Sequence, residues 1–430
     1  MRFDILNMEK ILIITYYFPP SGGAGVQRWL KMMKFLPDFG YEPVVLTVDS
    51  KYASYPQYDP SMLAEVPTGV TVYKTKSKEI LSVYKKVSPT HQIPYSGFAN
   101  EPQPNFFQKV ARFIRGNFFL PDPRRGWNKY AYKKACEIIE REQIKIVITT
   151  SPPHSTQLVG LKLKKKYPAL QWIADLRDPW SEIYYNKDLY QTAWARKRNL
   201  RYECEVLSKA DKILTVSTMC AQLFESKVFP RPSVFVMPNG YDPDDFVDLF
   251  TVPNKGKRVL SYVGVFNQQY RIDVLYKALK RLAPSWSDSL LIRFVGVVSD
   301  QVIVKLKELP YEIEVVEYVS HKKAISYMHS SDILLLCIPD IPNNKGILTG
   351  KLFEYMASRR PILLMGPQDG DAAYIVESNR AGVCCNYDAH LVANYIDYLM
   401  DEEPQYLNSH YEQFSRRVTA QRLAIMLKSL

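Results

Sequence analysis

Apolar runs of strand length alternate with segments of helical periodicity along almost the whole chain. Such alternation is typical of βαβ units, in which helices connect parallel strands. In the first half the expected strands are Ile11–Tyr17, Val44–Val48, Ile144–Thr149, Trp172–Ala174, Lys212–Val216 and Ser233–Met237. In the second half they are Val259–Phe266, Leu290–Val297, Ile313–Tyr318, Ile333–Ile338, Pro361–Met365 and Gly382–Cys385. We therefore predict an α/β fold with two doubly wound, Rossmann-like domains.

Length and turn-forming residues suggest where the domains divide. A chain of 430 residues is long enough for about two to three domains. The acidic turn Pro238–Phe246 separates residues 1–238 from residues 239–408, and residues 409–430 form a last helix that we expect to pack back on the first domain. Because no further cluster of metal-binding side chains accompanies this turn, we expect it to be solvated rather than to bind a metal.

Charge is distributed unevenly between the two halves. Residues 1–240 contain 35 Lys and Arg against 21 Asp and Glu, whereas residues 241–430 contain 21 against 23. A basic first half indicates an anionic partner, either a membrane surface or nucleic acid, with a solvated basic face as the alternative. Because the aromatic residues form no recognisable RNA- or DNA-binding module, we expect no nucleic-acid partner.

Cysteine usage and the start of the chain indicate the compartment. The six cysteines lie mostly in apolar segments, without the spacing of a metal or redox motif, so we expect reduced core residues. The apolar run Ile11–Phe18 is too short to cross a bilayer, and Asp4 and Glu9 do not fit the basic start of a signal peptide. We therefore expect a cytoplasmic protein.

A cation and a carboxylate stand one helical turn apart in the segment Thr349–Ala357. Lys351 and Glu354 share one helix face, and the helix start at Gly350 offers free backbone N–H groups to a phosphate. Because predicted strands flank this segment, the helix start lies at the carboxyl end of a parallel sheet, where ligands bind. The pattern predicts a sugar-nucleotide site, with an ordinary exposed Lys/Glu pair as the alternative.

Two more glycine turns follow predicted strands. Gly22 and Gly23 lie in a proline-containing loop after the first strand, and their spacing differs from a dinucleotide-binding turn, which disfavours a dehydrogenase. A flexible loop is the alternative there. In the second half, Gly264 precedes a helix that begins near Arg271, whose guanidinium suits a diphosphate.

Polar side chains also follow two neighbouring predicted strands of the first half. His154 and Asp178 are the candidate catalytic residues: His154 could orient or deprotonate a hydroxyl group, and Asp178 could bind acceptor hydroxyls. Asp175 and Arg177 stand beside Asp178 and are further candidates for acceptor binding. The alternatives are a histidine on a surface loop and a simple ion pair between Asp175 and Arg177.

Five motifs, taken together and in order, resemble those of family-four retaining glycosyltransferases. They are the Gly22-Gly23 loop, Ala174–Trp180, Pro238–Pro243, Gly264 with Arg271, and Gly350–Tyr355. The resemblance spans nearly the whole chain. Each motif is weak alone, and the set is much less specific for any one substrate than for the family.

The resemblance implies the GT-B fold, in which two Rossmann-like domains face each other across a cleft. It implies that the C-terminal domain binds a UDP- or GDP-sugar, that the N-terminal domain binds the acceptor, and that hexosyl transfer requires no metal or other cofactor. By the same resemblance Arg271 and Lys351 would neutralise the leaving diphosphate, Glu354 would hold the ribose, and Gly22 and Gly23 would border the reacting sugar. Members of this kind build surface polysaccharides, including lipopolysaccharide.

One position departs from the family pattern. The family commonly carries a second glutamate eight positions before the ribose-binding one, and this chain has Gly346 there. The usual contact to a sugar hydroxyl is therefore missing, and Lys345 with the backbone of residues 346–350 is a candidate replacement. The retaining mechanism lets the donor phosphate accept the proton of the acceptor, so a protein base such as His154 would be dispensable.

Aromatic and basic residues recur at helical spacing within residues 98–127. The apolar positions are Phe106, Phe107, Val110, Phe113, Ile114 and Phe118, with Lys109, Arg112 and Arg115 between them. This pattern is typical of a helix at an anionic membrane interface, and a buried core helix with solvated arginines is the alternative. An interfacial helix would place the protein on the inner face of the plasma membrane, with a glycan or lipid-linked acceptor.

Two rival functions remain open on the sequence alone. A sugar-nucleotide epimerase of the same fold would use the same donor residues and would consume donor without an acceptor. A non-catalytic glycan- or nucleic-acid-binding protein would explain the basic first half but would leave the segment Gly350–Glu354 without a role.

Overall fold

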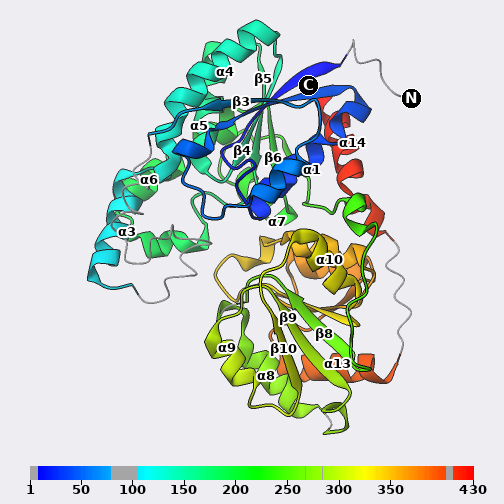
Figure 1. The fold of residues 1–430 in the computed structure, drawn as a ribbon. Coiled ribbons are helices and arrows are strands. Elements are labelled where there is room, and N and C mark those ends of the chain that lie inside the picture. The colour runs from blue at the N-terminus through cyan, green and yellow to red at the C-terminus, as the bar shows by residue number, and fades with distance from the viewer. Residues whose placement is uncertain (1–7, 79–103, 267, 283, 403–409) are drawn as a thin grey trace. The chain divides into compact units, whose positions relative to one another are not determined.

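The computed structural model describes residues 8–78, 104–266, 268–282, 284–402 and 410–430 (Figure 1). Residues 98–103 of the predicted amphipathic segment, residue 267 after Gly264, and residue 409 at the predicted boundary lie outside these ranges. The chain divides into two compact units. The first contains Met1–Pro238 and Thr419–Leu430, and the second contains Asn239–Val418.

The first unit is built on a parallel sheet of seven strands within the described residues, in the order β3-β2-β1-β4-β5-β6-β7. The strands are β1 (Glu9–Ile14), β2 (Tyr41–Val48), β3 (Thr71–Thr75), β4 (Ile146–Ser151), β5 (Gln171–Leu176), β6 (Lys212–Thr215) and β7 (Val234–Val236). The central strands are apolar on both sides because helices cover both faces of the sheet.

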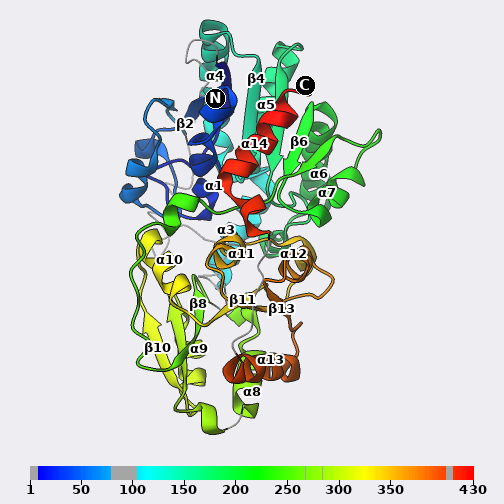
Figure 2. The same ribbon diagram turned by 90° about the vertical axis from the view of Figure 1, so that its right-hand side faces the viewer.

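Strand β1 shows how the two faces are filled. Ile11 and Ile13 point into a core with α1 (Ala24–Met33) and α14 (Arg416–Leu427), whereas Leu12 and Ile14 pack with α4 (Asn128–Glu142) and α5 (Gln157–Lys166) on the other face. This follows from the two-residue period of a strand. One side of α14 thus lies in the core of the first unit, next to α1 (Figure 2), through Ala420, Leu423, Ala424, Met426 and Leu427.

The second unit has a parallel sheet of six strands among the described residues, in the order β10-β9-β8-β11-β12-β13. The strands are β8 (Arg258–Val263), β9 (Leu290–Val295), β10 (Glu312–Val316), β11 (Ile333–Cys337), β12 (Ile362–Met365) and β13 (Gly382–Cys384). One face carries α8 (Ile272–Arg281), α9 (Asp300–Leu306) and α13 (Ala389–Asp401). The other carries α10 (His321–His329), α11 (Gly350–Ala357) and α12 (Asp371–Ser378).

The predicted fold class is confirmed: both sheets are parallel and doubly wound. Each of the twelve predicted strands has a counterpart, and β3 was missed because it is a half-exposed edge strand with an alternating polar pattern. Three further helices of the first unit are α3 (Phe106–Phe118), α6 (Ala193–Lys209) and α7 (Thr218–Glu225). In the part of the chain described here, no helix combines the length and the apolar character that crossing a bilayer requires.

Candidate functional site

The start of α11 is left open toward solvent. Thr349 precedes the helix in an extended conformation, but its hydroxyl does not cap the helix and has no hydrogen-bond partner although it is buried. A Cβ built on Gly350 would meet no atom within 4 Å. The N–H groups of the first turn therefore lack a side-chain acceptor and carry the positive end of the helix dipole, which suits an anion.

Lys351 places a partly buried ammonium group beside this helix start. Its Nζ donates a hydrogen bond to Tyr262 Oη at 2.6 Å and makes no ion pair with any described residue. Burial lowers the pKa of Lys351 to about 8, against the opposing effect of nearby Cys337 and Glu354. A desolvated cation held only by a neutral phenol is well placed to bind an incoming anion.

Gly264 makes room for this lysine at the end of β8. Its φ is +126°, and a Cβ there would lie 3.0 Å from Lys351 Nζ. Gly296, at the end of β9, has φ +120°, and a Cβ there would come within 2.5 Å of the Gly264 carbonyl oxygen. Both positions favour glycine because φ is positive there. A Cβ would crowd the Lys351 side chain at Gly264 and the backbone of Gly264 at Gly296.

Glu354 lies one helical turn after Lys351, as predicted from its spacing. Its Oε1 is 3.6 Å from Nε2 of His321, which is also 3.3 Å from Asp245 Oδ2. His321 and Asp245 were not identified from the sequence, because the acidic turn was interpreted as solvated and His321 begins α10 far along the chain. The three side chains form a polar cluster beside the helix start.

Arg271 is already engaged by two carboxylates. It precedes α8 with φ +52°, its Nε and Nη2 contact Asp273 at 3.0 and 3.1 Å, and its Nη1 contacts Asp340 at 2.7 Å. These partners raise its pKa. Its guanidinium also lies over the Tyr387 ring, 5.8 Å from the centroid. To bind a diphosphate, Arg271 must therefore exchange or share its contact with Asp340.

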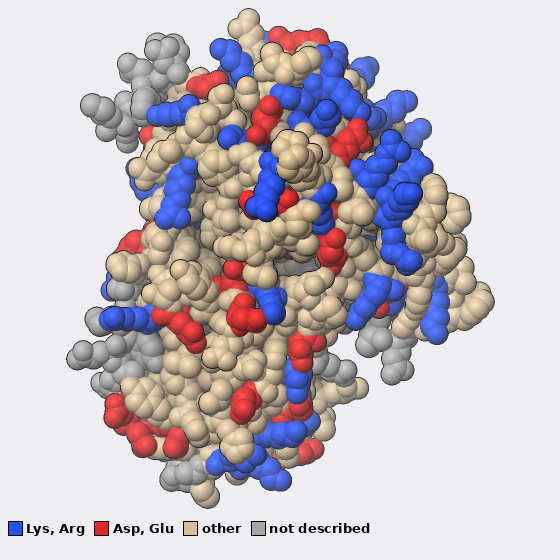
Figure 3. All heavy atoms as spheres, turned by 180° about the vertical axis from the view of Figure 1, so that it is seen from behind, with Lys and Arg blue, Asp and Glu red and all other residues tan. Residues whose placement is uncertain are grey.

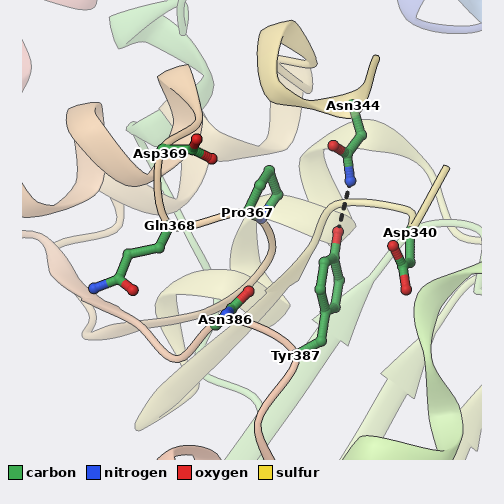
Figure 4. Close-up of a pocket in the computed structure, with 7 residues that line it drawn as sticks. All are labelled: Asp340, Asn344, Pro367, Gln368, Asp369, Asn386 and Tyr387. Atoms are coloured by element: carbon green, nitrogen blue, oxygen red, sulfur yellow. Dashed lines mark hydrogen bonds between the residues drawn. The ribbon is translucent and has the colours of Figure 1, made fainter. Parts of the chain in front are cut away.

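A polar pocket of about 520 Å³ opens among the loops that follow β11, β12 and β13 (Figure 4). Its lining residues carry carboxylate, amide and phenol groups and are Asp340, Asn344, Pro367, Gln368, Asp369, Asn386 and Tyr387. Asn344 Nδ2 donates to Tyr387 Oη at 2.9 Å, and Lys345 Nζ pairs with Asp369 at 2.5 Å. The pocket lies beside Gly346, where the family glutamate is missing. The sequence did not reveal it because its residues are scattered over three loops.

In the first unit, Gly22 and Gly23 shape the loop between β1 and α1. Gly23 has φ +89°, and a Cβ on Gly22 would come within 3.0 Å of the Gln57 side chain. The Gly22 N–H donates to the Gln57 carbonyl at 3.0 Å. The loop is therefore fixed against a neighbouring segment rather than flexible.

Asp175 is a buried anchor, not an exposed acceptor ligand. It is 0% exposed, and its carboxylate accepts hydrogen bonds from Arg28 at 3.1 and 3.2 Å, Trp29 at 2.8 Å and Thr150 at 2.8 Å. This geometry does not favour the predicted acceptor-binding role. The predicted pair with Arg177 is replaced by a pair with Arg28, which fixes α1 against β4 and β5.

Arg177 has a similar structural place. It is 8% exposed, and its guanidinium donates to the carbonyl oxygens of Ser151 and Gly25, both at 2.8 Å. It therefore joins the end of β4 to the start of α1. Asp178, by contrast, is only half-buried, and burial raises the pKa of its carboxyl. Among Asp175, Arg177 and Asp178, Asp178 is the most exposed to solvent.

His154 lies in a short 3₁₀ helix after β4 and is 7% exposed. Its imidazole stacks on Trp180 with ring centroids 5.1 Å apart, and neither ring nitrogen has a hydrogen-bond partner in the part of the chain described here. Burial, together with Arg177 and Lys227, lowers its pKa to about 3. His154 is therefore a neutral and very weak base at physiological pH, which disfavours proton abstraction.

Comparisons with known proteins agree with this architecture. The family described as Glycosyltransferase Family 4 matches residues 93–245, and the family described as Glycosyl transferases group 1 matches residues 249–419. No curated protein sequence matches the chain.

Solved structures of similar fold cover the chain almost completely. Sucrose-phosphate synthase from Thermosynechococcus elongatus is 14% identical, with a TM-score of 0.62 and 98% of each chain covered. Alr3699/HepE from Anabaena, in complex with UDP and glucose, is 13% identical, with a TM-score of 0.62 over 98% of this chain and 100% of that one. WaaG, a glycosyltransferase involved in lipopolysaccharide biosynthesis, is 12% identical, with a TM-score of 0.57 over 97% and 99%.

The two family matches follow one another along the chain. The first lies mostly in the first unit, of which it leaves out the residues before 93, and the second covers most of the second unit. At these identities the solved structures establish the fold, and the family matches establish the class of reaction. The chain therefore belongs to the glycosyltransferases, as a family-four-like member with the GT-B fold.

Proposed function

We propose that this glycosyltransferase moves a hexosyl group from a nucleoside-diphosphate sugar to a glycan or lipid-linked acceptor, with retention of anomeric configuration. The observation that carries the proposal is Lys351, a partly desolvated cation without an ion-pair partner among the described residues, beside the uncapped start of α11. A diphosphate at this position would receive both the ammonium charge and the backbone N–H groups. The similar Anabaena structure holds UDP and glucose, which supports a nucleotide sugar as donor.

The second unit offers a group for each part of such a donor. Lys351 and the first turn of α11 would bind the diphosphate, Arg271 would join them by exchanging Asp340, and Glu354 would accept hydrogen bonds from ribose hydroxyls. In the polar pocket beside Gly346, Asp369 and the amides are suited to sugar hydroxyls. They would take the place of the missing family glutamate.

The chemistry needs little from the first unit beyond acceptor binding. The acceptor hydroxyl attacks the anomeric carbon, the bond from that carbon to the diphosphate oxygen breaks, and the proton passes to the departing phosphate. The low pKa of His154 agrees with a reaction that uses no protein base. Asp178 is our candidate to bind and orient acceptor hydroxyls.

We propose that the reaction requires no metal, because Lys351 and Arg271 supply positive charge that a divalent cation would otherwise supply. We expect activity to persist in excess EDTA. If EDTA abolished activity and added Mg²⁺ or Mn²⁺ restored it fully, the proposal of a metal-independent reaction would be contradicted.

A thermal-shift screen tests the donor site directly, because a ligand that binds only the folded state raises its melting temperature. UDP, GDP, ADP and CMP and their common sugar conjugates would be compared with and without EDTA. We expect stabilisation by one nucleoside diphosphate, lost in Glu354→Ala and kept in the surface control Glu402→Ala. No shift with any nucleotide would argue against the donor site.

Turnover then separates the proposal from its two rivals. Consumption of donor only in the presence of an acceptor supports transfer. Conversion of the sugar without any acceptor would indicate an epimerase, and nucleotide binding without turnover on any acceptor would indicate a binding protein.

We place the enzyme in the cytoplasm, at the cytoplasmic face of the membrane, in synthesis of a surface polysaccharide such as lipopolysaccharide.

A further inference from the structure

Helix α3 buries polar side chains and exposes apolar ones, the reverse of an ordinary surface helix. The side chains buried against the first unit are Arg112 and Asn117, together with Gly116. The apolar positions point outward, and Phe106, Phe107 and Phe118 are 73%, 81% and 72% exposed. We define the α3 face as Phe106, Phe107, Val110, Phe113, Ile114 and Phe118, all at least 40% exposed. The predicted alternative of a buried core helix is therefore wrong.

Specific contacts hold the helix in this orientation. A Cβ on Gly116 would lie 2.4 Å from the Leu189 carbonyl oxygen, so only glycine fits there. Asn117 donates to the Tyr190 carbonyl at 3.2 Å and accepts from the Thr192 N–H at 2.7 Å. At the other end, Asn105 and Gln108 form a reciprocal capping box. Close packing at Gly116 and hydrogen bonding at Asn117 select the face that is turned outward.

Helix α6 lies against α3 and carries a further exposed aromatic residue together with basic residues. Its Trp194 is 60% exposed. Arg198 lies over the Trp194 ring, 5.2 Å from the centroid. A shallow hollow of about 390 Å³ is lined by Trp194, Lys197, Arg198, Arg201, Tyr202 and Glu205. Lys and Arg side chains are numerous over the first unit in the view from behind (Figure 3).

We propose that the α3 face inserts into the surface of an anionic lipid bilayer, and that the hollow on α6 binds lipid phosphate groups through Lys197, Arg198 and Arg201. Exposed aromatic rings bordered by arginine and lysine match the apolar and anionic layers of a bilayer surface. An apolar patch of this kind on a folded protein indicates an interaction site. A symmetric contact with a second copy would bring the same cations together, which disfavours self-association.

This surface goes beyond the donor site and does not depend on it. It would bring the first unit to the lipid anchor of a membrane-bound acceptor. Donor binding in the second unit needs none of the residues of the α3 face. A missing thermal shift with nucleotide would therefore count against the proposed function alone, and missing vesicle binding against the membrane proposal alone.

Sedimentation with vesicles tests the proposal on the full chain. Vesicles of phosphatidylcholine alone and with roughly 30% phosphatidylglycerol would be compared at low and high salt. We expect pelleting with the anionic vesicles, weakened by salt, and a loss of at least about tenfold in the double variant Phe107→Asp/Phe118→Asp. Tyr374→Asp, at an equally exposed aromatic residue on α12, serves as the matched control and should bind as the unmodified chain does.

Trp194 gives a second readout on the same surface. The other tryptophans are buried or half-buried, so contact with brominated lipids should quench mainly its fluorescence. Arg198→Glu/Arg201→Glu should abolish the preference for anionic vesicles, while Lys280→Glu on α8 should leave it unchanged. No binding to anionic vesicles at low salt would overturn the proposal. So would a dimer in solution that dissociates in the Phe107→Asp/Phe118→Asp variant.

Discussion

The Lys351 ammonium has the electrostatic properties of an anion receptor that titrates near physiological pH. Its pKa in the folded chain is about 8, below the ordinary value of 10.5. Because the protonated form is the one that attracts a diphosphate, affinity for the nucleoside diphosphate should fall as pH rises through about 8. Calorimetric titration across this range measures the effect. The arginine of the Lys351→Arg variant stays protonated across this range. Any nucleotide affinity that the variant retains should therefore not fall near pH 8.

The same burial makes Lys351 costly for stability. The unfolded chain binds a proton here more tightly than the folded chain, so stability should rise as pH increases from about 8 to 10.5, where the ammonium is lost from both states. Replacing it by an apolar side chain removes the penalty at neutral pH. Lys351→Met should therefore raise the free energy of unfolding by an amount on the order of 1–3 kcal/mol, and with it the melting temperature. The same variant should lose the nucleotide-induced thermal shift. A lower melting temperature would contradict this assignment.

Asp369 tests the polar pocket separately from the diphosphate site. Its side chain is 69% exposed and pairs with Lys345, which lowers its pKa. If it binds sugar hydroxyls, Asp369→Ala should raise KM for the sugar donor roughly five- to tenfold and leave affinity for the free nucleoside diphosphate unchanged. Equal weakening of both would place the pocket's role at the diphosphate instead.

At the scale of elements, the Arg28–Asp175 pair fixes helix α1 to the sheet. Both side chains are fully buried, so Asp175→Asn removes the carboxylate that balances the buried Arg28 charge. We expect a loss of about 3–5 kcal/mol in the free energy of unfolding, measured by denaturant titration. Asp178→Asn is the matched comparison, because burial disfavours the charged form of the Asp178 carboxyl group and raises its pKa.

We expect Asp178→Asn to leave stability unchanged or slightly raised, and to raise KM for the acceptor without altering nucleotide binding. An equal loss of stability in the two variants would mean that Asp178 is also structural.

The sequence predicted features that depend on residues close together in the chain, and it did not predict contacts between residues far apart in the chain. Strands and helices follow from hydrophobic periodicity, and Lys351 with Glu354 follows from spacing on one helix. The partner of Asp175 could not be predicted, because Arg28 lies far away in the chain. The amphipathic pattern of α3 was visible, but the side turned outward depends on Gly116 and its close approach to Leu189.

Loop-built sites were the least predictable for the same reason. The pocket at Asp369 and the cluster of His321 with Asp245 combine residues from separate connections, each unremarkable in its own sequence context. Gly346, in place of the family glutamate, was the local signal that pointed to this part of the second unit.

At the scale of the whole molecule, the first unit depends on residues 419–430. Leu423, Ala424 and Leu427 of α14 are buried in its core with α1. Removing residues 419–430 should therefore strip protection from hydrogen exchange in β1 and α1, while the second unit keeps its protection and its nucleotide-induced thermal shift. Hydrogen-exchange mass spectrometry measures both units at once. A uniform loss across the chain would show that the two units unfold together.

That core also imposes an order on biosynthesis. The second unit is an insertion within the first, because the segments of the first unit flank it in the chain. A ribosome must therefore translate residues 239–418 before α14 can leave the exit tunnel, which takes roughly 9–36 s at ordinary elongation rates. During that interval the second unit is free to fold while the apolar surfaces of β1 and α1 remain without their covering helix. The nascent chain is then a natural client for chaperones, which bind such surfaces until synthesis reaches the closing segment.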